Sequence, residues 1–253
     1  MRNKLIRLAA LTALTLATPA LAQSTGSIRI GAHRGFWNCD EASHTENSIA
    51  SLRTAQEYGL WGSEFDVHLT ADDVVVVHHD AHIQGQDIQK NTYGFLKQYK
   101  LANGETMPTL DEYLTQAEGC STTVLVLELK SQYSKEREDK LVDIALKQLK
   151  DHGLYDPSRV MFISFSMNIC KKLAAEAPEF TNQYLNGDIA PSLLKKDGIN
   201  GIDYHYSVFY KHPEWVKEAH DEGMSVNVWT VNKEQDMKSR SCFFHSPNCC
   251  CKR

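Results

Sequence analysis

Residues 62–80 read GSEFDVHLTADDVVVVHHD, and we interpret them as two β-strands joined by a turn. Successive side chains of a strand point to opposite faces, so the first strand has one apolar face and one polar face. The apolar face comprises Phe65, Val67 and Leu69, and the polar face comprises Glu64, Asp66 and His68. Four residues, 70–73, precede the valine run 74–77 of the second strand. A parallel crossover needs about a dozen or more, so the stretch predicts an antiparallel hairpin with its apolar face against a core.

The two carboxylates of the polar face need a cation or hydrogen-bond donors if that face lines a cleft, because desolvating a charge is costly. A divalent metal is one such cation, since Mg²⁺ and Ca²⁺ prefer carboxylate oxygens. An edge hairpin with a solvated acidic face is the alternative, and the hairpin alone favours neither. Residues 123–130 read TVLVLELK, a strand whose Glu128 and Lys130 need partners on an otherwise apolar segment. Glu128 is therefore a natural third carboxylate for a metal.

The rest of the chain alternates strands with helices, which predicts a parallel sheet. Seven strands of this type end near His33, Thr70, Lys130, Ser166, Asn186, Tyr206 and Asn232. A closed (β/α)₈ barrel needs one more, and residues 239–253 do not resemble it. We therefore expect an α/β fold, a TIM (β/α)₈-type barrel over residues 27–238 that lacks its eighth strand and helix. Thr45 is expected to cap the first helix, and residues 81–107 to form a small insertion over the site.

The two ends of the chain depart from this pattern. Residues 1–22 carry three basic residues ahead of an apolar run and Ala-Leu-Ala, which predicts a secretory signal peptide and an exported protein, periplasmic or secreted. Its removal changes the formal charge from −5 to −5 − 3 = −8, which disfavours nucleic acid and anionic bilayers as partners. No stretch is long enough for a membrane anchor, and nothing in the composition indicates a particular oligomeric state.

The tail at residues 239–253 holds four of the seven cysteines. Their C-x₆-C-C-C spacing suits no zinc site, and we interpret the tail as foreign to the fold. The other three, Cys39, Cys120 and Cys170, are scattered and do not resemble a disulfide framework.

Five short motifs follow one another at the ends of the expected strands and at the start of the first helix. They are His33-Arg34-Gly35, Glu46-Asn47, Glu64-x-Asp66, His79-Asp80 and Glu128-x-Lys130. In this order they resemble the glycerophosphodiester phosphodiesterase family, over about residues 28–237. Two further segments support the resemblance: Asn103-Gly104-Glu105 ahead of Pro108-Thr109-Leu110, and Trp229-Thr230-Val231-Asn232.

The resemblance implies a TIM barrel with a small insertion after the hairpin. It also implies metal-dependent hydrolysis of small-molecule glycerophosphodiesters to sn-glycerol 3-phosphate and an alcohol. Glu64, Asp66 and Glu128 match the metal ligands, and all-oxygen ligation favours Ca²⁺ or Mg²⁺, with Mn²⁺ as a third candidate. His33 and His79 match the general acid–base pair, and the family's His-Asp order selects His79 over His78. The positions that bind the substrate or its phosphate match Arg34, Lys130, Glu46 and Trp229.

The sequence supports three other functions less well. A histidine-ligated amidohydrolase-type barrel would need His-x-His where the chain has residues 33–35. A phospholipase C- or D-like enzyme acting on lipid head groups shares the histidine pair and the barrel. It should have an exposed apolar rim, for which the cluster at residues 93–99 is the one candidate. A catalytically silent module for phosphorylated ligands would follow from the missing end of the barrel. Within the family interpretation, we expect Tyr93, Phe95 and Tyr99 to set selectivity for the alcohol.

Overall fold

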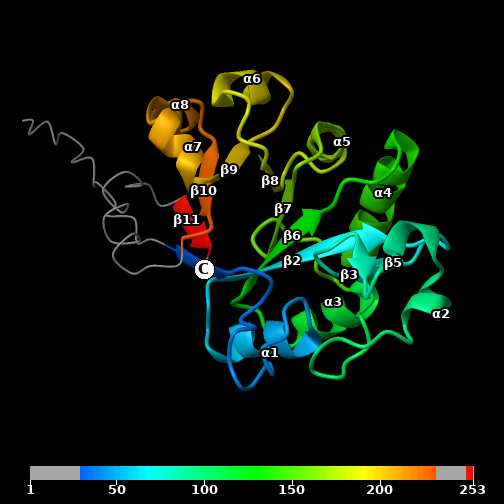
Figure 1. Ribbon diagram of the computed structural model, residues 1–253. Helices are drawn as coiled ribbons and strands as arrows, with labels where there is room; N and C mark the ends of the chain where they lie inside the picture. The colour runs from blue at the N-terminus through cyan, green and yellow to red at the C-terminus, as the bar shows by residue number, and fades with distance from the viewer. Residues whose placement is uncertain (1–28, 232–248, 253) are drawn as a thin grey trace, which may run out of the picture.

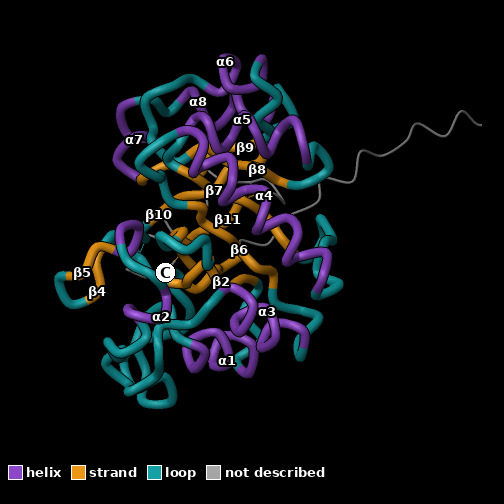
Figure 2. The backbone as a smooth tube through the Cα atoms, turned by 90° about the vertical axis from the view of Figure 1, so that its right-hand side faces the viewer, coloured by secondary structure: helices purple, strands orange, loops and turns teal. Residues whose placement is uncertain are grey.

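The computed structural model describes residues 29–231 and 249–252. Parallel strands curl into a ring with helices packed around its outside (Figures 1 and 2). The strands of the ring are β1 (Arg29–Ala32), β2 (Gly62–Leu69), β6 (Val124–Leu129), β7 (Val160–Ser164), β8 (Thr181–Tyr184), β9 (Gly201–His205), β10 (Ser225–Trp229) and β11 (Cys249–Lys252). The helices between them are α1 (Ile49–Glu57), α3 (Leu110–Glu118), α4 (Lys135–Asp151), α5 (Met167–Glu176), α6 (Pro191–Lys196), α7 (Tyr206–Lys211) and α8 (Glu214–Asp221). The predicted barrel-type fold is confirmed.

The hairpin strand β3 (Val75–Val77) pairs antiparallel with the last residues of β2, from Val67 to Leu69. At its other end β2 pairs in parallel with β1, through Gly62 and Ser63. Along its length β2 also pairs in parallel with β6, which sets Asp66 beside Glu128. The predicted hairpin is therefore present, and it projects from the carboxyl end of the ring.

The eighth place of the ring is occupied by β11. Its backbone pairs in parallel with β1, from Arg29 to Gly31, and with β10, from Val226 to Val228. The eighth strand and helix of the family type are not found among the described residues, but β1 and β10 still have a strand to pair with at this place. Any short segment that supplies backbone donors and acceptors can pair with a strand edge, whatever its side chains.

The apolar faces of the strands lie outside the ring and pack against the helices. Phe65, Val67 and Leu69 of β2 are fully buried in one core cluster together with Leu110 and Leu114 of α3. A second cluster covers the other half, where Ile202 and Tyr204 of β9 meet residues of α6 and α8. This packing leaves the other face of β2 and β6 to line the interior of the ring.

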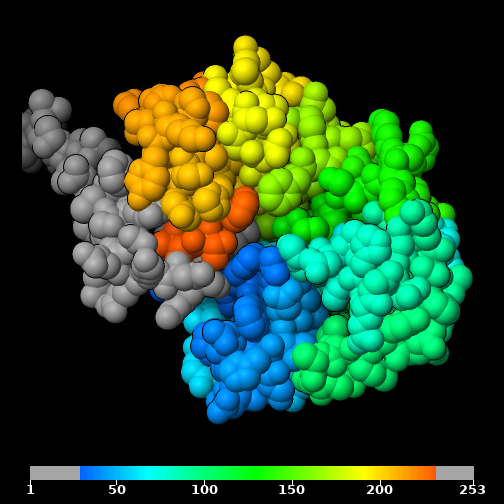
Figure 3. Space-filling model, viewed as in Figure 1, coloured from blue at the N-terminus to red at the C-terminus, as the bar shows by residue number. Residues whose placement is uncertain are grey.

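Residues 81–107 form a compact insertion between the hairpin and α3. It contains β4 (His82–Ile83), β5 (Gln86–Asp87), the 3₁₀ helix η1 (Ile88–Lys90) and α2 (Tyr93–Leu96). A small core of its own includes Ile83, Ile88, Leu96 and Met107, with Tyr93 and Tyr99 packed against it. The insertion adjoins the surface of residues 33–57 (Figure 3).

The first helix starts later than the sequence indicates. Ser48, not Thr45, is the N-cap, and its hydroxyl accepts a hydrogen bond from the Ser51 amide. Asn47 has a φ of +50°, a left-handed conformation that asparagine tolerates and that a helix cannot contain. The helix therefore cannot extend back to Thr45.

None of the helices among the described residues is long and apolar enough to span a bilayer. The predicted signal peptide at residues 1–22, residues 232–238 of the expected barrel and residues 239–248 of the tail lie outside the described residues.

Candidate active site

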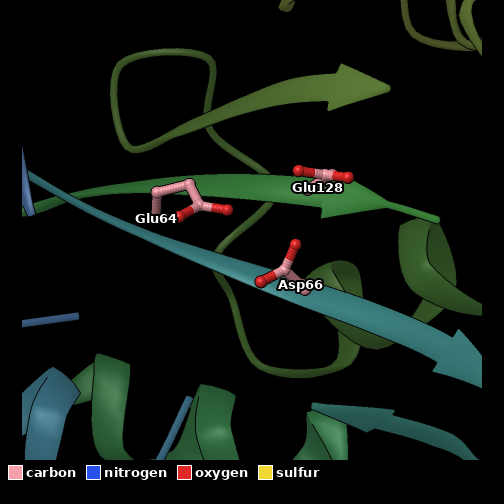
Figure 4. Close-up of side chains that lie close together, drawn as sticks. All are labelled: Glu64, Asp66 and Glu128. Carbon is pink, nitrogen blue, oxygen red and sulfur yellow. The ribbon is translucent and has the colours of Figure 1, made fainter. Parts of the chain in front are cut away.

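Three carboxylates meet inside the carboxyl end of the ring. Glu64 and Asp66 come from β2 and Glu128 from β6, and all three are buried. One oxygen of each lies within 4.8 Å of the others, and Figure 4 shows the three groups close together on the two strands. Strand alternation puts them on the inner face, and the register that pairs Asp66 with Glu128 brings the two strands together. The structure thus brings all three predicted metal ligands into one cluster.

Lys130 lies against this cluster. Its Nζ is 2.8 Å from Glu128 Oε1 and 3.2 Å from Asp66 Oδ1. Burial lowers the pKa of Lys130, but the charges of Glu128 and Asp66 outweigh it and raise that pKa. Burial likewise raises the pKa of Asp66, but Lys130, His79 and a hydrogen bond from Asn47 outweigh it and lower that pKa. Asp66 is therefore ionised at neutral pH and forms an ion pair with the Lys130 ammonium.

The donor set fits a hard divalent cation. Carboxylate oxygens alone converge here, which favours Mg²⁺, Ca²⁺ or Mn²⁺ over a thiolate- or imidazole-seeking metal. The spacing of the oxygens allows one ion to be shared by the three carboxyl groups.

Asn47 holds Asp66 with both ends of its amide. Its Nδ2 donates to Asp66 Oδ2 at 2.9 Å, and its Oδ1 accepts from the Asp66 amide at 3.1 Å. The backbone N–H of Asn47 donates to the Arg34 carbonyl. Asn47 belongs to a predicted motif but had no predicted role, because its partner, Asp66, is 19 residues away on β2. Asparagine in a polar loop ahead of a helix was the signal that could have indicated it.

The segment after β1 wraps around Glu64. The Arg34 amide donates to Glu64 Oε2 at 2.7 Å, and His33 Nε2 lies 3.8 Å from the same oxygen. The guanidinium Nη1 of Arg34 donates to both carboxylate oxygens of Glu46, at 3.0 and 2.9 Å. Glu46 therefore orients Arg34, a role that its sequence position alone did not indicate.

Gly35 is required where this segment passes α1. Its φ is +78°, and a Cβ there would lie 2.3 Å from Ser51 Oγ. Any other residue would push the His33-Arg34 segment away from α1. The glycine therefore fixes how closely His33 and Arg34 approach β2.

The three histidines of the hairpin have different partners. His79 Nδ1 lies 2.7 Å from Asp80 Oδ1; because a carboxylate accepts, Nδ1 carries the proton and Nε2 is left to exchange one. That hydrogen bond is the main cause of the lowered pKa of Asp80. The ring of His78 instead contacts the His82 carbonyl, and burial lowers its pKa. His68 contacts the His79 carbonyl, and burial lowers its pKa to about 4.

Trp229 lies at the end of β10, with its ring beside those of Phe165 and His205. Its indole N–H donates to the Asp203 carbonyl at 3.0 Å. The donor is thus already used, and Trp229 can offer a substrate its ring but not a hydrogen bond to phosphate. A cavity of about 510 Å³ lies beside His33 on the side of β1. Its lining includes Ile30, Phe36, Trp37, Leu60 and Thr230.

The aromatic residues of the insertion are largely structural. The Tyr93 hydroxyl donates a hydrogen bond to the Met107 carbonyl at 3.2 Å, and Tyr99 packs against the insertion core. Phe95 is 40% exposed and is the one of the three that presents its ring to solvent. The predicted effect of these residues on alcohol selectivity stays a prediction, with Phe95 as its main candidate.

Comparison with known proteins gives one consistent family. The model of the glycerophosphoryl diester phosphodiesterase family matches residues 33–241. A glycerophosphodiester phosphodiesterase of Caldanaerobacter subterraneus is 28% identical, with 82% of this chain and 87% of that protein covered.

Two solved structures are similar over most of their length. A glycerophosphodiester phosphodiesterase from Parabacteroides distasonis is 40% identical with a TM-score of 0.85, covering 90% of this chain and 93% of that one. A phosphodiesterase from Oleispira antarctica, solved with the product sn-glycerol-3-phosphate, is 24% identical with a TM-score of 0.70. That alignment covers 88% of this chain and 92% of that one.

Proposed function

Because the chain belongs to the glycerophosphoryl diester phosphodiesterase family and is thus a phosphoric diester hydrolase, we propose that it hydrolyses glycerophosphodiesters by histidine acid–base catalysis with a divalent metal. The products are sn-glycerol 3-phosphate and an alcohol. The observation that carries this proposal is the buried cluster of Glu64, Asp66 and Glu128, with His33 beside it. The Oleispira phosphodiesterase, which binds the same product, gives the proposal its substrate class.

Glu64, Asp66 and Glu128 would hold the metal, which would supply positive charge to a phosphodiester oxygen and stabilise charge that develops there. Arg34 and Lys130 add fixed positive charge at the same end of the ring. Their carboxylate partners, Glu46 for Arg34 and Glu128 with Asp66 for Lys130, hold the two side chains in place before substrate arrives. Such preorganised charge stabilises the transition state without reorganisation.

His33 and His79 would move the protons. One takes a proton from the attacking hydroxyl, and the other gives a proton to the leaving alkoxide. A general acid and a general base of one reaction must hold opposite protonation states when the substrate is bound. Asp80 fixes the tautomer of His79 by accepting from Nδ1, which leaves Nε2 as the atom that transfers the proton. His33 lies within 3.8 Å of Glu64 Oε2, so it faces the acidic cluster.

The test is turnover of a panel of glycerophosphodiesters with choline, ethanolamine, inositol and glycerol head groups, with and without chelator. We expect hydrolysis that chelator abolishes and that Mg²⁺, Ca²⁺ or Mn²⁺ restores. Turnover that is unchanged in chelator would remove the metal from the proposal. Binding of sn-glycerol 3-phosphate without turnover would instead indicate a silent binding module.

A lipid phosphodiesterase is the second candidate, and the cavity beside His33 favours it. Ile30, Phe36, Trp37 and Leu60 make much of that lining apolar, so the cavity could accept an acyl chain attached to the glycerol. Lysophosphatidylcholine added to the same panel separates the two substrates. Faster hydrolysis of the lysolipid than of glycerophosphocholine would support the second candidate.

We also propose that the protein is exported, on the basis of residues 1–22. Expression with a bacterial secretion system and sequencing of the mature N-terminus test this. We expect a chain that begins at Gln23 in the periplasm or medium, and an intact N-terminus in the cytoplasmic fraction would contradict export.

A further inference from the structure

His68 lies on the inner face of β2, two residues after Asp66, and is 3% exposed. Its Nε2 is 3.2 Å from the carbonyl oxygen of His79. A carbonyl only accepts, so Nε2 carries the proton and donates. Nδ1 is then a bare acceptor, and it is buried with no hydrogen-bond partner among the described residues. Leaving a buried polar atom without a partner is unfavourable, and an apolar side chain of the same size would avoid that cost.

The carbonyl that accepts this hydrogen bond belongs to the peptide group between His79 and Asp80, which makes no other hydrogen bond among the described residues. His79 lies in a bend just beyond β3. The preceding residue is fixed, because the His78 amide donates to the Asp66 carbonyl at 3.0 Å. The peptide group between His79 and Asp80 is fixed by the His68 ring. Its orientation sets the direction of Asp80, and Asp80 in turn holds the imidazole of His79 at 2.7 Å.

We propose that His68 is a positioning residue that holds the His79 main chain and thereby directs the His79 imidazole into the site. The inference rests on the proposed function, since it gives His79 a proton to transfer. It assigns a chemical purpose to a buried histidine that neither the acidic cluster nor the substrate-binding residues require. In this role His68 acts as a single N–H donor, through Nε2 of its ring.

Two substitutions distinguish a donor from a space filler. His68→Gln keeps an N–H donor at a similar reach, and His68→Met has similar length but no donor. We expect His68→Met to lower kcat by about 10- to 100-fold with KM changed by less than about twofold, because a catalytic group displaced by about 1 Å costs up to about 10²-fold. His68→Gln should recover most of the rate. Equal rates for the Met variant and wild type, or equal losses for Met and Gln, would overturn the proposal.

A second comparison shows whether His68 acts through His79. In a His79→Ala background, His68→Met should cause no further loss, because residues that act as a unit are not additive. An equal further loss in that background would indicate a general structural role and contradict the inference. Thermal midpoints of all variants report whether any of them fails to fold.

The ¹⁵N chemical shift of the Asp80 amide provides a readout that does not depend on turnover. This nitrogen belongs to the same peptide group as the His79 carbonyl, so its shift should move in His68→Met and stay near the wild-type value in His68→Gln. If wild type hydrolyses no substrate but the shift difference is present, the proposed function fails and the positioning contact stands. An unchanged shift in both variants would refute the positioning itself.

Discussion

Three buried carboxyl groups lie together at the centre of the site, with Lys130 against two of them. Replacing any of Glu64, Asp66 or Glu128 by its amide removes a charge and a strong oxygen ligand. We expect each of Glu64→Gln, Asp66→Asn and Glu128→Gln to abolish turnover, and calorimetric titration to show weakened binding of Mg²⁺ or Ca²⁺. Asp151→Asn is a matched control, since Asp151 is an exposed carboxylate paired with Lys147 on α4. A triad variant that keeps full activity in chelator would contradict the metal role.

The choice of His79 over its neighbour gives a separate prediction. We expect His79→Ala to lower kcat by about 10²- to 10⁴-fold, the usual contribution of a general acid or base. His78→Ala is the control, because the His78 ring contacts the His82 carbonyl instead of a carboxylate. The rate against pH should be bell-shaped in wild type and lose one limb in His79→Ala. A dead His78→Ala with a normal His79→Ala would show that the wrong histidine was chosen.

At the level of elements, Glu105 joins the insertion to the first helix. Its carboxylate accepts from the amides of Ile49 and Ala50, at 2.8 and 3.1 Å, which are otherwise without intrahelical partners at the start of α1. We expect Glu105→Ala to lower the free energy of unfolding by about 0.5–2 kcal/mol, the usual range for a lost helix cap. Glu105→Gln should lie between, since it keeps one acceptor but no charge. Thermal or denaturant unfolding measures this.

Glu57→Gln is the control for that experiment. Glu57 is exposed and lies in the last turn of the same helix, where a negative charge interacts unfavourably with the helix dipole. Its removal should change stability little or raise it. A loss as large as that of Glu105→Ala would mean that any charge change on α1 matters, and not the cap.

The contact between α3 and α4 should depend on pH. His152 bridges Glu118 through Nδ1 at 2.6 Å and Asp111 through Nε2 at 3.0 Å. Burial lowers the pKa of His152, but the two carboxylates outweigh it and raise that pKa. A raised folded-state pKa gives stability that is fully present below the unfolded value of about 6.5 and lost as pH rises through the folded value.

Wild type and His152→Gln should therefore differ most in unfolding free energy near about pH 6 and converge near about pH 9. Urea unfolding at the two values measures the difference. A gap that widens with pH would contradict this assignment. Asp111→Asn with Glu118→Gln should remove the stabilisation at low pH while leaving His152 in place, because only the lowering effect of burial on the His152 pKa then remains.

Local patterns predicted most elements of the fold because strands such as β2 and β6 have apolar residues at alternate positions. The hairpin, Glu128 and α3 could all be predicted from such patterns. The helix at residues 135–151 was not predicted, although α4 buries Leu141, Ala145 and Leu149 at helical spacing. Contacts that loops make with distant residues could not be predicted. Asn47 with Asp66, Glu46 with Arg34 and Glu105 with α1 depend on how loops approach one another in three dimensions, which no single segment specifies.

At the scale of the whole molecule, the ring closes only because β11 lies between β10 and β1. Each residue from Arg29 to Gly31 has a backbone partner there, and so does each from Val226 to Val228. His33 follows directly after β1, so loosening that strand would also disturb the segment that wraps around Glu64.

We therefore expect deletion of residues 249–253 to lower both stability and activity. Each backbone hydrogen bond contributes about 0.5–1.5 kcal/mol net, so losing both pairings should cost about 2–5 kcal/mol out of the usual 5–15 kcal/mol. Two newly exposed strand edges also favour association between chains. The thermal midpoint, light scattering and chelator-sensitive hydrolysis of the deletion and full chain measure these effects.

A single substitution tests the same contact without shortening the chain. Cys250 pairs with Arg29 on one side and Asn227 on the other, and proline has no backbone N–H and is not tolerated between two paired strands. Cys250→Pro should therefore approach the deletion in midpoint and activity, and Cys250→Ser, which keeps the backbone N–H, should stay close to the full chain. If both the deletion and Cys250→Pro match the full chain, then the ring is stable when open at this place. The apolar contacts of β1 and β10 with their other neighbours would then be enough to hold the site together.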